Sequence, residues 1–239
     1  MFEIVLPRLF QLYSESEQDN PINYFKDFEK RILCGDREFL HAVIDVEKDL
    51  SFLDQDAWNS LKAKCLPYVC NFDSKKHRGW SQLINCFREA KGYIFLKNEN
   101  YNNISFIDIS RQETPDLIGL KDGKWTLLEV KCINQSHICL ENIFDNNCVE
   151  VKPEISLGFK EKIMSTAKKA KSQLMKYSQA EMEFPRRICL FIIDVDLDFH
   201  IDPHKFKIVE NFMSECKSNI HEIELQFQIL PPYGFNNIA

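Results

Sequence analysis

Residues 114–131 read TPDLIGLKDGKWTLLEVK, two short apolar segments joined by the dipeptide Asp-Gly. An Asp-Gly pair between two apolar segments is the strongest short-range signal for a β-hairpin. If the turn consists of these two residues alone, Asp116 lies directly opposite Glu129. Opposed residues share one face with Cβ atoms roughly 4.5–5.5 Å apart, and Lys131 points to the same face. The sequence therefore predicts two acids and a lysine together on one side of a hairpin.

The apolar residues of this hairpin favour burial on both of its faces. They occupy alternating and adjacent positions alike: Leu117, Ile118, Leu120, Trp125, Leu127, Leu128 and Val130. Charges at the end of a buried hairpin are costly unless they are paired or bound to a metal. The alternative is a surface hairpin with solvated charges, or a register shifted by one residue, in which Asp116 would no longer lie opposite Glu129.

The charged ends of the hairpin resemble the signature of the PD-(D/E)XK nuclease superfamily, whose fold is restriction-endonuclease-like. Pro115-Asp116 matches the PD element, and Glu129-Val130-Lys131 matches the (D/E)XK element. The resemblance implies that both acids and the carbonyl of Val130 bind Mg²⁺ or Mn²⁺, hard cations that prefer oxygen ligands. It also implies that Lys131 orients the attacking water or stabilises developing negative charge.

A long basic helix is predicted over residues 158–177 from its three- and four-residue apolar spacing. Gln173 and Tyr177 are neighbours on one face of this helix. They resemble the Gln-x-x-x-Tyr element of the RecB-like branch of the same superfamily, which implies that they position the nucleic acid strand or the attacking water. The helix also carries six lysines, at positions 160, 162, 168, 169, 171 and 176. These either contact phosphates or simply make a soluble surface.

The neighbouring segments give the order of elements that the resemblance implies. Residues 79–91 form a helix that is expected to end at Gly92. Residues 93–97 and 104–109 are strand-like, and residues 186–195 form a buried strand. Together with the hairpin and the basic helix, they predict an α/β (α+β) fold with an α-β-β-β-α-β core. Helices would flank a mixed central sheet.

In the resembled superfamily, the helix before the hairpin often supplies a further acid to the metal. Glu89 is the only acid in residues 79–91, and it lies closer to the end of the helix than the family pattern suggests. Gln82 or Asn85 is the alternative occupant of the family position. Glu89 is therefore either an additional metal ligand or an exposed charge.

The remaining chain divides into a helical N-terminal extension and a short C-terminal region. The extension covers residues 1–78, with helices expected at 22–33, 36–50 and 54–68. It would guide the substrate or form the interface of a homodimer or another protein partner. The core covers residues 79–200. Residues 201–239 add a helix and an edge strand packed on the core, and Pro231-Pro232 ends the regular structure.

Residues 134–157 interrupt the path from the hairpin to the basic helix. Cys132, His137, Cys139 and Cys148 lie in or near this insertion, and Cys and His are the usual ligands of structural zinc. No closely spaced Cys-x-x-Cys pair occurs among them. A zinc site and a loop or small hairpin beside the active site are the two interpretations.

The composition of the 239 residues argues against secreted and membrane-spanning classes. Nine cysteines without a regular framework fit reduced thiols in the cytoplasm, and no signal peptide is evident. The apolar run at 188–193 is too short to span a bilayer. The net charge of −6 does not suggest a nucleic-acid-binding protein, so any binding surface must be basic locally.

These observations predict a Mg²⁺- or Mn²⁺-dependent nuclease that hydrolyses phosphodiester bonds in DNA. Two alternatives stay open. One is an RNA-cleaving enzyme with the same site. The other is a non-catalytic module that kept the fold and binds nucleic acid or protein.

Overall fold

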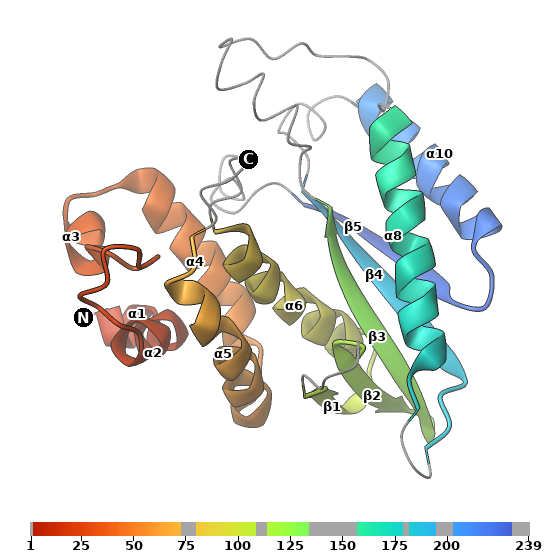
Figure 1. The fold of residues 1–239 in the computed structure, drawn as a ribbon, viewed down its shortest axis with the longest axis horizontal. Coiled ribbons are helices and arrows are strands. Elements are labelled where there is room, and N and C mark those ends of the chain that lie inside the picture. Colours follow the sequence, from red (N-terminus) through yellow and green to blue (C-terminus); the bar gives the residue numbers. More distant parts are fainter. Residues whose placement is uncertain are drawn as a thin grey trace. The chain divides into compact units, whose positions relative to one another are not determined.

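The computed structural model of the chain describes residues 2–72, 80–108, 114–133, 157–178, 182–194 and 203–230. Eight helices and five strands lie in these segments, so the fold is of the predicted α+β class with a mixed sheet (Figure 1). The described residues divide into two compact units. One unit is formed by residues within 1–94, and the other by residues within 95–231.

The first unit is helical, as predicted for the N-terminal region. Its helices are α1 (Phe2–Val5), α2 (Pro7–Glu15), α3 (Phe28–Leu33), α4 (Arg37–Ser51), α5 (Gln55–Val69) and the greater part of α6 (Ser81–Asn98). Buried aromatic and aliphatic side chains form its core, among them Leu12, Phe25, Phe28, Leu50, Trp58 and Leu61.

Two local features decide where these helices begin and end. Gly35 has a φ of 72°, which only glycine adopts without strain, and it follows the end of α3 as predicted. The Asp54 side chain accepts the N–H of Ala57 at 2.9 Å and caps α5. The helix expected over 22–33 is confined to α3, because the Asn23 side chain accepts the N–H of Phe25 at 2.8 Å and holds that segment in a turn. Helices α1 and α2 were not predicted.

The prediction of a strand over residues 93–97 is wrong, because α6 continues through Gly92 to Asn98. Its buried residues recur every three or four positions across that glycine: Leu83, Phe87, Ala90, Tyr93 and Leu96. This spacing is the period of a helix, which outweighs the local preference of the aromatic and β-branched residues. The strand before the hairpin is β1 (Asn102–Phe106) alone.

The second unit is built on one five-stranded sheet. After β1 come β2 (Leu117–Lys121), β3 (Lys124–Ile133), β4 (Arg186–Asp194) and β5 (Glu224–Leu230), and the strands lie side by side in that order (Figure 1). The pairs β1–β2 and β2–β3 are antiparallel, whereas β3–β4 and β4–β5 are parallel. With α6 before β1, and α8 (Leu157–Lys176) between β3 and β4, the order helix, three strands, helix, strand agrees with the prediction.

The hairpin has the predicted register. Asp122 and Gly123 have φ values of 52° and 73°, as a two-residue type I′ turn requires. Pairing therefore starts at Lys121 opposite Lys124 and continues without a break to Leu117 opposite Leu128. Leu117, Leu127 and Leu128 are fully buried, which confirms that apolar residues on both faces of the hairpin are covered.

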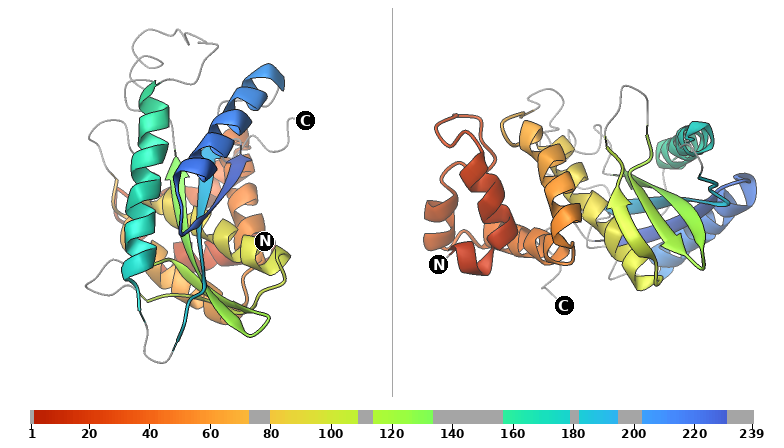
Figure 2. Two further views of the ribbon diagram at one scale, coloured as in Figure 1. Left: turned by 90° about the vertical axis from the view of Figure 1, so that its right-hand side faces the viewer. Right: turned by 90° about the horizontal axis from the view of Figure 1, so that it is seen from below.

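Helices α8 and α10 (Pro203–Asn219) cover the same face of the sheet (Figure 2). Ile163, Ala167, Ala170 and Leu174 of α8 pack with sheet residues that include Leu127 and Ile133. Successive side chains of a strand point to opposite faces, so residues 127, 129, 131 and 133 of β3 all point toward this helical layer. On the other face, Gly119 lets Tyr101 approach closely: an added Cβ would lie 3.2 Å from Tyr101 Cδ1.

Candidate active site

Asp116 immediately precedes β2 and still contacts β3. Its backbone N–H donates to the carbonyl of Leu128 at 3.1 Å. Its side chain also bonds to β3, because Oδ2 of the carboxylate accepts the N–H of Val130 at 2.8 Å. The N–H and C=O of a strand residue point to the same side of the strand. The Val130 carbonyl therefore also points toward the start of β2. Asp116 and two groups of β3 therefore converge where β2 begins.

Glu129 lies in β3 between Leu128 and Val130, the two residues to which Asp116 is hydrogen-bonded, and only 2% of its side chain is exposed. One of its oxygens forms an ion pair with the ammonium group of Lys131. The other accepts a hydrogen bond from Gln173 Nε2 at 3.0 Å. A buried carboxylate is costly without partners, and here both oxygens have one.

Lys131 is a cation in this site. Burial opposes its charge, but the Glu129 carboxylate, and after it Asp116, outweigh burial and raise the pKa of Lys131 above its ordinary value. The predicted group of two acids and a lysine thus exists, with two carboxyl groups beside one ammonium group.

Gln173 joins this group from α8, as predicted. The same Nε2 that donates to Glu129 also donates to the carbonyl of Thr114 at 2.5 Å. Gln173 therefore ties α8 to β3 and to the segment that leads into β2. Because Gln173 comes from a distant helix, the resemblance to the Gln-x-x-x-Tyr element predicted its place in the site, whereas the hairpin alone did not.

Tyr177 lies one residue beyond α8, and its backbone N–H donates to the carbonyl of Gln173 at 3.2 Å. Its ring packs against Phe184, with centroids 5.8 Å apart, and burial raises the pKa of its phenol. It lines a pocket of about 340 Å³ together with residues 178, 182–185 and 187. Tyr177 thus lines this pocket, while direct contacts link Glu129 to Lys131 and to Gln173. Asp116 is held beside them by the N–H of Val130.

No protein-family model, curated protein or solved structure matches this chain. The resemblance to the nuclease superfamily therefore rests on the motifs of the sequence, and the family stays a prediction.

Cys189 is a neighbour of the site that sequence reasoning did not identify. It lies in β4 next to Glu129 in the parallel ladder and is fully buried. Burial, and after it the charge of Glu129, raises the pKa of this thiol well above its ordinary value. The Cys189 side chain is therefore an uncharged thiol beside Glu129. No local signal could have found it, because it depends on the register between two strands that are far apart in sequence.

Glu89 belongs to the first unit, where its carboxylate lies 2.5 Å from the ammonium group of Lys64. Its role as a metal ligand stays a prediction. Across the described segments, no three His, Cys, Asp or Glu side chains gather in a way that could hold a metal ion.

The predicted zinc ligands lie mainly outside the described residues. Cys132 is a half-buried thiol near the end of β3. His137, Cys139 and Cys148 fall in residues that the structure does not describe. The zinc prediction is therefore untested.

In the segments that are described, none of the helices combines the length and apolar character that crossing a membrane needs.

Proposed function

We propose that this chain is a metal-dependent nuclease that hydrolyses phosphodiester bonds of DNA. The observation that carries the proposal is the convergence of Asp116, Glu129, Lys131 and Gln173 on the face of β3 that α8 covers. A simple surface ion pair would not account for it. Glu129 is buried, and Asp116 is held in place through the N–H of Val130.

The proposed family is the PD-(D/E)XK superfamily, and the proposed fold is restriction-endonuclease-like. Support comes from the sequence motifs at Pro115-Asp116 and Glu129-Val130-Lys131 and from the order of elements α6, β1, β2, β3, α8 and β4. The position of Gln173 against Glu129 supports the RecB-like branch.

The donor set of the site fits Mg²⁺ or Mn²⁺. Two carboxyl groups and the Val130 carbonyl offer hard oxygen ligands, and they lie beside one ammonium group in a mostly buried place. Asp116, Glu129 and Val130 would hold the ion. When bound, a divalent metal makes water a better nucleophile at neutral pH and stabilises charge on phosphate oxygens.

The protein's own groups would contribute position and charge. Lys131 places a cation next to the two carboxylates, where it can stabilise negative charge that develops on a phosphate. Gln173 fixes the orientation of the Glu129 carboxylate through its hydrogen bond. The low exposure of Glu129 strengthens both interactions, because charges interact more strongly away from water. Tyr177 is proposed to position the DNA strand.

A cleavage assay with the full chain tests the proposal. Linear DNA is incubated with Mg²⁺ or Mn²⁺, and Glu129→Gln and Lys131→Ala are each expected to lower the rate by about 10²-fold or more. Lys124→Ala is the matched control, because it removes an exposed lysine from the same strand. Far-UV circular dichroism checks that all variants are folded. Cleavage that both site variants retain, or that the control loses equally, would contradict the assignment.

A non-catalytic module is the second candidate function, and the ion pair between Glu89 and Lys64 favours it. This contact engages the one acid of the predicted first core helix within its own unit. Calorimetric titration with Mn²⁺ separates the two candidates. Absence of binding, or binding that Asp116→Ala leaves unchanged, would favour the module.

A further test separates the possible substrate classes. A panel of single- and double-stranded DNA and RNA separates DNA cleavage from the RNA-cleaving alternative. We infer a cytoplasmic location, supported by the seven described cysteines, none of which is in a disulfide bond. A homodimer or protein partner of the N-terminal helical region stays a prediction.

A further inference from the structure

Helix α8 has two chemically different flanks. Gln173 marks the flank that faces β3 and the candidate site. The opposite flank faces α10 and the segment before β5. There, the Lys160 ammonium group lies 5.5 Å from the centroid of the Phe212 ring, and Lys171 forms an ion pair with Glu222. Lys160 and Lys171 are thus engaged in contacts within the protein.

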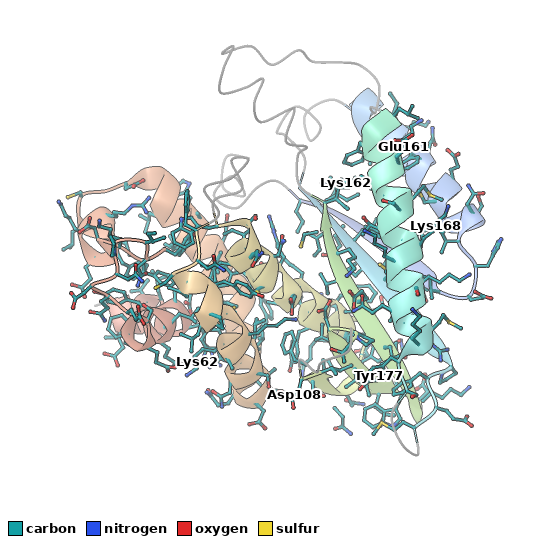
Figure 3. The ribbon with its side chains drawn as sticks, viewed as in Figure 1. Lys62, Asp108, Glu161, Lys162, Lys168 and Tyr177 are labelled. Carbon is teal, nitrogen blue, oxygen red and sulfur yellow. The ribbon has the colours of Figure 1, made fainter. Side chains whose placement is uncertain are left out.

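Helical geometry places the other lysines of α8 relative to Gln173. With about 100° of rotation per residue, Lys162, Lys169 and Lys176 lie within about 20°, 40° and 60° of the direction of Gln173. Lys168 lies about 140° away. Figure 3 agrees with this, since Lys162 is on the side of α8 toward β3 and Lys168 is on the opposite side. We call Lys162, Lys169 and Lys176 the lysine row.

The lysine row makes a locally basic strip on a chain with a net charge of −6. Its members are seven residues apart, which separates them by about 10 Å along the helix. Glu161 is the only acid of α8, and it points about 120° away from Gln173. Lys169 and Lys176 are exposed to solvent. The strip is therefore not neutralised by its own helix, and it lies on the flank that Gln173 connects to Glu129.

We propose that the lysine row binds successive phosphates of the DNA strand and leads that strand into the candidate site. This inference rests on the proposed nuclease function and specifies how the substrate is held. Regularly spaced ammonium groups complement a chain of phosphates, and each phosphate contact releases a bound counterion.

Salt dependence of binding tests the row directly. Binding of a fluorescent DNA oligonucleotide to the full chain is measured in EDTA between about 50 and 200 mM salt. The variant Lys169→Gln/Lys176→Gln is expected to weaken binding and to reduce the slope of log K against log salt by about 1.4–1.8, which corresponds to two lost phosphate contacts. The matched control, Lys168→Gln/Lys171→Gln, removes the same charge from the same helix and is expected to keep the slope.

The possible outcomes separate the row from the general electrostatics of the helix. Equal losses of slope in both double variants, or no loss in either, would overturn the proposal. Lys169→Arg/Lys176→Arg is expected to keep the wild-type slope, because the charge is preserved. Thermal unfolding of every variant verifies that the fold is intact. Tighter, row-dependent binding of RNA of the same sequence would overturn DNA as the occupant.

The results that would contradict the lysine-row proposal differ from those that would contradict the proposed nuclease function. If the wild-type chain cleaves DNA and the row variant keeps the wild-type salt slope of binding, the lysine-row proposal is wrong and the nuclease proposal stands. If the wild-type chain binds DNA with a row-dependent slope and does not cleave, the row stands and the nuclease function is wrong. If it neither binds nor cleaves, both are wrong.

Discussion

Replacing Lys131 with methionine tests how the charge of Glu129 is held inside the sheet. The exposed fraction is 2% for the Glu129 side chain and 28% for Lys131. Removing one partner of a fully buried ion pair costs about 3–5 kcal/mol, because the remaining charge is uncompensated. Lys131 has some contact with solvent, and Gln173 still donates to Glu129 in the variant. We therefore expect Lys131→Met to lower the free energy of unfolding by about 2–3 kcal/mol.

Urea unfolding followed by far-UV circular dichroism at pH 7.5 measures this loss. With a slope of about 2–3 kcal/mol per M, the midpoint is expected to fall by about 1 M. The control is Lys121→Met, since Lys121 and Glu99 form an exposed ion pair 3.9 Å apart and such pairs contribute about 0–1 kcal/mol. The double variant Glu129→Gln/Lys131→Met is expected to recover most of the loss, because no unpaired charge remains.

The pH dependence gives a second check on the same ion pair. Glu129 and Asp116 raise the pKa of Lys131 against the opposing effect of burial. A raised pKa of a lysine stabilises the folded state at every pH below the unfolded pKa of about 10.4, and this stabilisation disappears as the pH rises through the folded pKa. The difference between wild type and Lys131→Met should thus be full at pH 7–9 and vanish in strongly alkaline solution. An unchanged midpoint in Lys131→Met, or an equal loss in the control, would refute the reasoning.

Three further substitutions test other parts of the second unit by the same unfolding measurement. Gln173→Glu places a second carboxylate against Glu129 and is expected to cost about 2 kcal/mol at pH 8. It should cost less at pH 5, where the two acids can share a proton. Gly119→Ala puts a Cβ 3.2 Å from Tyr101 Cδ1 and should lower the thermal midpoint by about 2–4 °C, as overpacking of about 1 kcal/mol does. Gly123→Ala strains a residue with a φ of 73° and should cost about 1–2 kcal/mol, whereas Gly123→Asn should cost less.

The hairpin could be predicted from the sequence because its determinants are local. A two-residue turn with positive φ at Asp122 and Gly123 fixes the register up to Leu117 opposite Leu128. This register brings Asp116 to the residues on either side of Glu129. Lys131 then follows from the alternation of side chains along a strand. The buried stripe of α8 could also be predicted, because its apolar residues recur every three or four positions.

The errors and omissions have physical causes of a different kind. The end of α6 was misread because residues 93–96 form a short apolar run, and such a run suits a buried strand as well as a helix. Only the tertiary burial of Tyr93 and Leu96 distinguishes the two. Cys189 was missed because its position beside Glu129 is set by a parallel pairing, whose register no local turn specifies.

The carboxylate of Asp116 completes the hydrogen bonding of Val130 just where the strand β2 starts, and this has a consequence for the order of folding. Asp116 and Val130 are 14 residues apart, whereas Gln173 and Glu129 are 44 apart. Short-range hairpins close within microseconds, and contacts across longer loops form later. The two acids should therefore meet before α8 docks, with Lys131 as their nearest compensating charge. Weakening Gln173 would then mainly accelerate unfolding, while weakening the hairpin would slow folding itself.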